Sequence, residues 1–326
     1  MTLPVDKKQN QLMTNLFFVA AVAVFCTILW GTAFPGIKIG YELFQIKTED
    51  IPSKLIFAGG RFAIAGIIVL LIGLFTKDRK KLKLRKKDLL PISLLSLFQT
   101  FLQYLLLYIG IVNVTGTKSS ILTSVAAFGS VILSAVFFKS DRLTLKKAVG
   151  CIVGIIGIIV MNLNGDGLAG FSLMGDGLVI MSNFSGAVGN VISKKISSGR
   201  SPIQISGWQL TVGGSALIII GSICGGRLIF YNIGCALILL YLAAMAGVAF
   251  MLWTMLLFYN DVSRVAVFNL LIPVFGTMWS GIFLRENIFT PENLLSLLLV
   301  CSGIFLVNFN IKKRTDHNAK TNGNHS

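Results

Sequence analysis

The chain has 326 residues, of which 54% are hydrophobic and only 13% are charged. Because globular domains carry about 25% charged residues, this composition is typical of a polytopic membrane protein and argues against a globular enzyme or binding domain. The formal net charge of +16 does not indicate a nucleic-acid partner, since the basic residues stand in short clusters between apolar stretches.

Charged residues divide the chain into long uncharged stretches. A helix needs about 17–25 residues to cross the hydrocarbon core of a bilayer, and nearly every stretch reaches this length. The short stretch 62–76 becomes long enough if its helix begins at Pro52 and takes Arg61 into the membrane. We therefore predict an all-α integral membrane protein with ten transmembrane helices, in the stretches 9–37, 52–76, 89–117, 119–138, 148–165, 177–193, 201–226, 228–260, 265–284 and 293–311.

The distribution of Lys and Arg predicts how these helices are oriented. With the N-terminus inside, the inner segments hold 22 basic residues and the outer segments hold 6, while Arg61 lies within the membrane. Cytoplasmic loops carry such an excess of basic residues, so both termini are expected in the cytoplasm. The lipid bilayer of the cell membrane is thus the expected surrounding of this multi-pass chain.

The first predicted helix contains an irregular stretch, Leu29–Lys38, with two glycines, a proline, a threonine and a tryptophan. Gly and Pro are tolerated in membrane helices because neighbouring helices satisfy the freed backbone groups. Trp30 lies too deep for the interfacial belt, so it is either a cavity wall or a packing residue, and Thr32 is a second lining candidate. The expected hinge or gating positions are Gly31, Pro35, Gly36 and, in the ninth helix, Pro273.

Arg61 is the only basic residue well inside a predicted span. Counted from Pro52 at about 1.5 Å per residue, it lies roughly 13 Å deep. A charge at that depth is costly, which makes Arg61 a functional candidate by default. Two interpretations stay open: it binds a carboxylate or phosphate of the substrate, or it is a structural residue that bonds backbone carbonyls or reaches out to the interface.

Amide side chains mark further candidate faces. Gln99 and Gln103 lie one turn apart on the third helix, and unpaired amides in hydrocarbon are costly, so their face turns toward protein or water. The sixth helix has a stripe of Ser and Gly that is a packing seam, a cavity wall, or both. The candidates to line a cavity there and in the ninth helix are Asn183, Asn190, Asn269 and Trp279, whereas Trp208 and Trp253, nearer helix ends, are expected in the interfacial belt.

The order of elements repeats in the two halves of the chain. The charged turn Phe138–Thr144 matches 283–290, and Gly157 and Gly303 stand 146 residues apart. A duplicated unit of five helices enters the membrane from the opposite side in its second copy, and such inverted repeats are typical of alternating-access transporters. The expected divisions are a cytoplasmic lead, two repeats and a disordered cytoplasmic tail, at 1–14, 15–163, 174–311 and 312–326.

Four short motifs stand out along the chain: Trp30-Gly31-Thr32-Ala33-Phe34 with Lys38, Pro52 with Gly60-Arg61-Phe62, Phe138–Thr144, and Pro273 with Phe283-Leu284-Arg285-Glu286. Together they resemble the EamA family of the drug/metabolite transporter superfamily, over about residues 16–310. The resemblance implies a ten-helix carrier of small metabolites, often an exporter, with a central cavity, and it leaves the substrate open. Asp141 stands where the family usually has Glu.

Residues for catalysis or metal binding are not where a membrane enzyme needs them. The two histidines, His317 and His325, lie in the polar tail, and no carboxylate stands in the middle of a span. We therefore predict no enzyme, no metal, no cofactor and no proton relay through carboxylates. The expected function is an alternating-access carrier that exports a small amino-acid-like or amphipathic solute across the cytoplasmic membrane, and the alternative is a channel for small polar solutes.

Oligomeric state is left open by the sequence. Gly150, Gly154 and Gly157 share one face of the fifth helix and favour a close helix contact. That contact lies either within the molecule, which we prefer, or across a homodimer.

Overall fold

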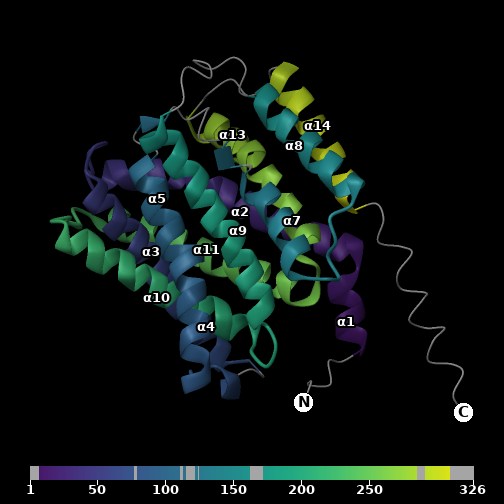
Figure 1. Ribbon diagram of the computed structural model, residues 1–326. Coiled ribbons are helices and arrows are strands. Elements are labelled where there is room, and N and C mark those ends of the chain that lie inside the picture. The colour runs from purple at the N-terminus through teal and green to yellow at the C-terminus, as the bar shows by residue number, and fades with distance from the viewer. Residues whose placement is uncertain are drawn as a thin grey trace, which may run out of the picture.

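The computed structural model describes residues 7–76, 79–110, 113–114, 122–123, 125–161, 172–284 and 291–308, and all its regular elements are helices (Figure 1). The first half contains α1 (Lys7–Thr14), α2 (Leu16–Leu43), α3 (Ile51–Leu74), η1 (Arg79–Lys81), α4 (Lys86–Ser96), the π-helical η2 (Leu97–Leu102), α5 (Gln103–Gly110), α7 (Val125–Phe137) and α8 (Leu145–Met161). The second half contains the π-helical η4 (Leu173–Gly177), α9 (Leu178–Ile196), α10 (Pro202–Ile223), α11 (Ile233–Tyr259), α12 (Val262–Ala266), η5 (Val267–Leu270), α13 (Leu271–Leu284) and α14 (Pro291–Asn308).

Six helical segments within the described residues are long and apolar enough to cross a membrane: Leu16–Leu43, Ile51–Leu74, Lys86–Gly110, Pro202–Ile223, Ile233–Tyr259 and Val262–Phe283. Two more are apolar but shorter, Val125–Phe137 and Leu294–Asn308. The all-α, multi-pass character expected from the uncharged stretches is confirmed. The count of ten helices and the cytoplasmic placement of both termini stay predictions.

Polar residues at the helix starts explain where the long helices begin. Asn15 accepts a hydrogen bond from the Phe17 amide at 2.9 Å and so separates α2 from α1, which forms in the expected polar lead. Asp50 accepts from the Ser53 amide at 3.0 Å at the start of α3. These caps satisfy amide groups that have no partner inside the helix. Boundaries within an almost continuously apolar chain are therefore set by a few polar side chains.

The two halves pack through helices that hold equivalent places in each half. α3 lies against α10 and α8 lies against α14, on opposite sides of the bundle in the view of Figure 1. α2 packs against α11 and α13, and in the matching way α9 packs against α5 and α7. Exchange of the halves thus leaves the α3–α10 and α8–α14 contacts unchanged and turns the contacts of α2 into those of α9.

Small residues set the contact between α8 and α14. A Cβ atom added to Gly150 would lie 2.7 Å from the Gly303 oxygen, and one added to Gly157 would lie 3.0 Å from the Ser296 oxygen. Since the earlier residue of α8 meets the later residue of α14, the helices run antiparallel. Gly150 and Ser296 are 146 residues apart, and so are Gly157 and Gly303. The two contacts are therefore equivalent under the repeat found in the sequence. These glycines face a helix of the same chain.

Glycines produce the same arrangement between α3 and α10. A Cβ atom on Gly59 would lie 2.6 Å from the Gly214 oxygen, and one on Gly66 would lie 2.5 Å from the Gly207 oxygen. Close approach of this kind is how small residues bring membrane helices together. This pair is also antiparallel, so helices in equivalent places of the two halves run in opposite directions.

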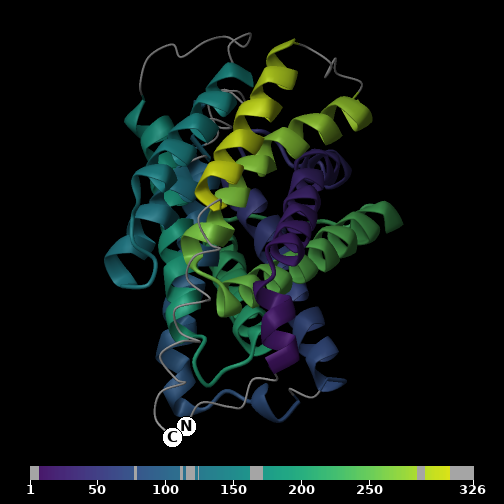
Figure 2. The ribbon, with the colours of Figure 1, turned by 90° about the vertical axis from the view of Figure 1, so that its right-hand side faces the viewer.

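The largest buried apolar cluster fills one end of the bundle, where α2 begins and α11 ends. Val19, Ala23 and Cys26 of α2 are all 0% exposed and pack with Leu256 and Leu257 of α11. Figures 1 and 2 both show α1 at this end. We call it the closed end, and the opposite end, where α2 ends and α3 begins, the mouth.

Candidate functional site

A cavity of about 480 Å³ lies between the two halves of the bundle. α2, α3 and the η2–α5 segment contribute one face each from the first half, and α9, α11 and η5 contribute faces from the second half. Sites for small molecules in proteins have volumes of about 300–1,000 Å³. The cavity therefore has the size and the central place expected of a site for a small solute.

Seven of the nine residues predicted to line a cavity do line this one: Trp30, Arg61, Gln99, Gln103, Asn183, Asn190 and Asn269. Thr32 and Trp279 lie outside the lining. The Thr32 hydroxyl donates to the Leu29 carbonyl at 2.7 Å and accepts from the Tyr241 hydroxyl at 2.9 Å. The Trp279 ring packs against Phe283 of the same helix at 5.9 Å.

The four predicted hinge positions lie on α2 and α13. A Cβ atom on Gly31 would come within 2.7 Å of Phe275 Cβ in α13, and one on Gly36 within 2.9 Å of Leu242 Cδ2 in α11. Pro35 lies inside the continuous helix α2. Pro273 is the third residue of α13 and follows the 3₁₀ segment η5 directly. Both glycines thus permit close helix contacts beside the cavity, and the hinge role of the four residues stays a prediction.

Aromatic rings form the floor of the cavity toward the closed end. The Trp30 ring meets Trp253 at 5.0 Å and Phe250 at 5.5 Å, both edge to face. The expectation that Trp253 belongs to an interfacial belt is wrong, because its side chain is only 2% exposed and lies in this floor. α11 continues for six residues beyond it, to Tyr259, and packs against α2 and α9 there.

Asn190 connects the floor to the surrounding helices. Its Oδ1 accepts hydrogen bonds from Trp253 Nε1 and from Gln99 Nε2, both at 3.2 Å, and its Nδ2 donates to Ser130 Oγ at 3.1 Å. The side chain thereby joins α9 to η2, α7 and α11. Gln99 and Asn190 fulfil both interpretations left open by the sequence, since they bond between helices and also line the cavity.

Arg61 is a buried cation that has no polar partner among the residues that the structure describes. The residue is 3% exposed, and its guanidinium carbon lies 4.4 Å from the Phe62 ring centroid and 5.7 Å from that of Tyr104. It makes no hydrogen bond or ion pair with any residue that the structure describes, and its Nε is buried without a partner. Aromatic faces stabilise a cation electrostatically but leave its N–H donors unused. The alternative in which Arg61 bonds backbone carbonyls is absent from the described part of the chain.

The charged side chains of the lining are all basic. Lys38 and Lys54 join Arg61, and in the described ranges no Asp or Glu lines the cavity. Lys54 Nζ donates to the Thr48 carbonyl at 2.6 Å and lies 5.2 Å from the centre of the Tyr41 ring. Over the same ranges, no group of three His, Cys, Asp or Glu side chains is placed to hold a metal ion. The electrostatic character of the site is therefore that of a receptor for negative charge.

The cavity leads toward the mouth. Lys38, Tyr41 and Lys54 also line a second cavity of about 420 Å³, which extends to Glu42 and to Thr48 in the α2–α3 connection. The central cavity therefore continues past two lysines to the end where α2 finishes. On the other side, the floor rests on the packed cluster of the closed end.

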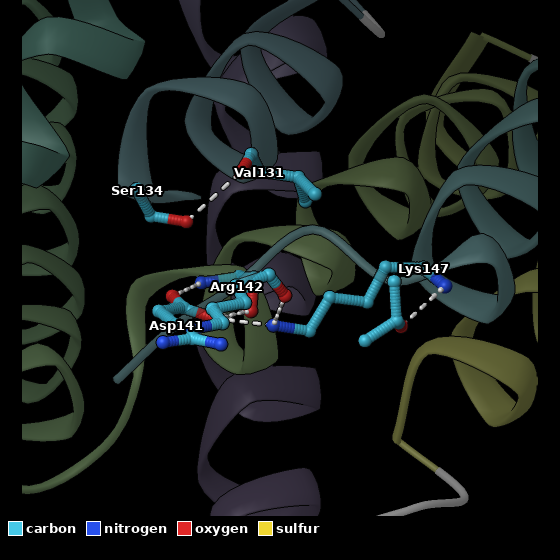
Figure 3. Close-up of polar contacts among 7 residues, drawn as sticks. Val131, Ser134, Asp141, Arg142 and Lys147 are labelled. Carbon is cyan, nitrogen blue, oxygen red and sulfur yellow. Dashed lines mark hydrogen bonds and ion pairs between the residues drawn. The ribbon is translucent and has the colours of Figure 1, made fainter. Parts of the chain in front are cut away.

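A buried carboxylate bonds the two halves together at the closed end. Asp141 lies in the turn between α7 and α8 and is 1% exposed. It accepts from Lys147 Nζ at 2.5 Å, from the Ser263 amide at 2.9 Å and from the Ser263 hydroxyl. Figure 3 shows Lys147 reaching the carboxylate from the start of α8. Burial raises the pKa of Asp141, but the hydrogen bonds from Lys147 and Ser263 outweigh it and hold the pKa below its ordinary value.

Further bonds hold the same end. Lys194 Nζ of α9 donates to the Phe258 carbonyl of α11 at 3.0 Å. Asn260 Nδ2, just after α11, donates to the Met13 carbonyl of α1 at 3.0 Å. The closed end is thus joined by polar bonds as well as by apolar packing.

Sequence reasoning missed several lining residues. Met245 and Phe250 gave no signal because α11 is apolar all round, so no face of it stands out. Lys38 and Lys54 were counted as loop charges that set topology. Lys54 stands seven residues before Arg61, about two helical turns, and so lies on the same face of α3. This spacing could have identified Lys54 as a lining residue.

Known proteins resemble the chain along most of its length. A protein of Salmonella typhimurium named "Probable amino-acid metabolite efflux pump" is 28% identical over 90% of this chain and 95% of its own length. An Archaeoglobus fulgidus protein named "Uncharacterized transporter" is 28% identical over 87% of this chain and 95% of its own. A solved crystal structure, at 16% identity, matches with a TM-score of 0.72 over 89% of this chain and 96% of its own. That last likeness shows a shared fold.

A family model matches both halves of the chain separately. The model describes the EamA-like transporter family and matches residues 17–163 and 173–309. The resemblance found in the sequence motifs is thereby confirmed, together with a duplicated organisation. The chain belongs to the EamA-like transporter family: it is a multi-pass membrane transporter and not an enzyme.

Proposed function

We propose that the chain is an alternating-access carrier that exports a small amino-acid-like or amphipathic solute across the cytoplasmic membrane. The observation that carries this proposal is a central cavity that leads to the mouth and ends on a packed floor. From Leu16 to Leu29 of α2, the layer beneath the floor is about 20 Å thick at 1.5 Å per residue. A channel, the alternative, needs a continuous polar path where this layer contains fully buried apolar residues such as Ala23.

The arrangement of the halves supports a rocking mechanism. Equivalent helices pack antiparallel at α3–α10 and α8–α14, as expected if the second half is an inverted copy of the first. In an inverted repeat, the two halves exchange conformations when the carrier changes the side on which its site is open. The closed end would open as the mouth closes, around a site that stays near the midplane.

Two further observations support the orientation of the carrier in the membrane and the choice of solute. The excess of Lys and Arg in the segments at the closed end supports a cytoplasmic closed end and an external mouth. The floor of Trp30, Trp253 and Phe250 offers an apolar surface to a solute, and the amides beside it offer hydrogen bonds. The names of the two enterobacterial relatives, from Salmonella typhimurium and Escherichia coli, refer to amino-acid metabolites and agree with this choice.

Solute counterflow in proteoliposomes tests the proposal. The purified protein is reconstituted and screened with labelled pools of amino acids and their derivatives, nucleosides, sugars and sugar phosphates. We expect saturable counterflow of one class, at least tenfold weaker in Trp30→Ala, whose ring lies in the floor. Trp279→Ala is the matched control because its ring lies outside the lining, and it should retain counterflow. Non-saturable flux without counterflow would favour the channel, and no flux with any pool would contradict the proposal.

A further inference from the structure

We propose that the transported solute is a net anion, with a carboxylate or phosphate held at Arg61 and an apolar body against the aromatic floor. This inference rests on the proposed function, since it names the solute class of the same cavity. An amino acid derivative whose amine is removed or acylated has this chemistry, because it keeps the carboxylate and loses the positive charge.

The first argument is the state of Arg61. The residue is 3% exposed and lines the cavity, and its guanidinium has no polar partner among the described residues. Its donors lie in the plane of the group, in a geometry that matches a carboxylate or phosphate with two hydrogen bonds. Phe62 and Tyr104 occupy positions near the group at 4.4 and 5.7 Å from its central carbon and offer it no acceptor oxygen through their ring faces. An anionic group of a solute is the partner this cation lacks.

The second argument is the charge of the whole lining. Lys38, Lys54 and Arg61 give three positive charges, and no carboxylate of the described chain lines the cavity to balance them. A cleft with charges of one sign and low-dielectric walls concentrates ions of the opposite sign. The cavity at the mouth adds Lys47 and Glu42, whose opposite charges offset each other. A cationic solute therefore still meets net positive charge on its way in, whereas an anion is attracted toward the arginine.

The third argument concerns the ammonium group of an ordinary amino acid. The lining offers it no carboxylate among the described residues, and Asn190 Oδ1 already accepts two hydrogen bonds. The acceptors left without a partner, Gln99 Oε1 and Asn269 Oδ1, are neutral amide oxygens and cannot offset the charge of an ammonium group. The edges and faces of Trp30 and Phe250 suit an apolar group of the solute. The cavity therefore favours a derivative without the ammonium over the zwitterion.

The membrane potential, negative inside, would drive the export of an anion. The described lining has no carboxylate to carry a proton along with the solute, so each monoanion that leaves moves one negative charge outward. A membrane potential of 100 mV, negative inside, then sustains about a 50-fold gradient of a monoanion at equilibrium. Export would need no separate coupling ion.

Four derivatives of one amino acid test the charge preference with a constant side chain. N-acetylphenylalanine is an anion, phenylalanine a zwitterion, N-acetylphenylalaninamide neutral and phenylalaninamide a cation. In counterflow, we expect N-acetylphenylalanine to compete at concentrations at least tenfold below those of the other three. Phenyl phosphate distinguishes the source of the anionic group: stronger competition than N-acetylphenylalanine assigns a phosphate, and weaker competition assigns a carboxylate.

A potassium diffusion potential, set with valinomycin, tests the movement of charge. Changing the interior of the proteoliposomes from about 60 mV negative to about 60 mV positive should raise the steady accumulation of labelled N-acetylphenylalanine about 100-fold. Accumulation that does not respond to the potential would overturn the uncoupled export of an anion.

Substitutions at Arg61 connect the preference to this residue. Arg61→Gln should remove the preference for N-acetylphenylalanine over N-acetylphenylalaninamide. Arg61→Lys should still prefer N-acetylphenylalanine but bind it more weakly. Lys195→Gln is the control, because Lys195 also lies over an aromatic ring, that of Phe137, but outside the cavity lining. If Arg61→Gln does not fold, the series of four derivatives and the response to the membrane potential, both measured on the unaltered protein, still test whether the solute is an anion.

The outcomes separate this inference from the proposed function. Counterflow of zwitterions or cations with equal or greater affinity than the anion would leave the carrier standing and overturn the anionic solute. An anion preference that persists unchanged in Arg61→Gln would overturn the role of Arg61. Failure of counterflow with every pool would contradict both proposals.

Discussion

At the mouth, Lys38 and Lys54 stand beside open space, whereas at the closed end Asp141 is 1% exposed and accepts from Lys147 and Ser263. The same helix, α2, serves both regions: its second half lines the cavity and its first half belongs to a packed cluster. The contrast shows that the two ends differ in what a conformational change must break. Opening the closed end must break the hydrogen bonds of a buried carboxylate to Ser263 of the other half and separate apolar surface, while closing the mouth must bring basic side chains together.

The largest loss of stability is expected from substitutions in the floor, where the cavity meets the packed cluster of the closed end. Trp253→Ala removes a buried ring that packs on Trp30 and donates to Asn190. Such truncations cost about 3–5 kcal/mol, so thermal unfolding in detergent should show a clear fall in stability. Trp253→Phe keeps an aromatic ring but removes the N–H donor and part of the buried ring volume, and a smaller loss of about 1–3 kcal/mol is expected. Equal losses in both variants would contradict a packed floor.

The next effect concerns the carboxylate of the closed end. Asp141→Asn weakens a buried ion pair with Lys147 and its bonds to Ser263, and about 1–3 kcal/mol of stability should be lost at neutral pH. Because hydrogen bonding holds the pKa of Asp141 below its ordinary value, its contribution is full above the unfolded pKa and is lost as pH falls below about 4. Thermal unfolding against pH should therefore flatten in the variant over that acidic range.

Cys26 reports opening of the closed end. Its side chain is 0% exposed within the packed cluster, whereas Cys224 and Cys301 are exposed. In a protein with Cys224→Ser and Cys301→Ser, we expect slow reaction of Cys26 with a maleimide and a several-fold faster reaction when Asp141→Asn is added. Mass spectrometry of the labelled peptide measures it. Unchanged protection would show that the carboxylate does not hold this end shut.

The smallest change in stability is expected at the mouth. Lys38→Gln alters an exposed side chain, so unfolding should shift by less than about 0.5 kcal/mol. Lys54 is 6% exposed and donates to Thr48, so Lys54→Gln should cost about 1 kcal/mol. Counterflow of an anionic solute should nevertheless weaken several-fold, and the weakening should fade at high salt as the charges are screened. An effect independent of salt would point to packing instead of charge.

The sequence predicted the class of fold because polar residues in apolar helices are informative. Arg61, Gln99 and Asn190 stand out against their helices, and all three reach the cavity. Thr32 shows a limit of predicting from a short motif alone. It is two residues from Trp30, about 200° around the helix, so the two side chains point to different sides of α2 and only Trp30 faces the cavity. Trp253 shows another limit, since depth along a helix says little about which neighbours cover it.

Positions far apart in the chain meet in ways that single helices do not reveal. The offset of 146 between Gly157 and Gly303 was readable, but its consequence, a pair of antiparallel contacts with Gly150 and Ser296, needs the packing of α8 on α14. In the same way, Asp141 was recognised as part of a turn, and its bond to Ser263 in the other half depends on tertiary structure.

The volume of the cavity also sets how many water molecules a bound solute must displace. Liquid water occupies about 30 Å³ per molecule, so 480 Å³ corresponds to about 16 water molecules. A solute that fills the space displaces this water into the medium on one side before each turnover. If the unloaded protein also changes its open side, it carries a comparable packet of water back.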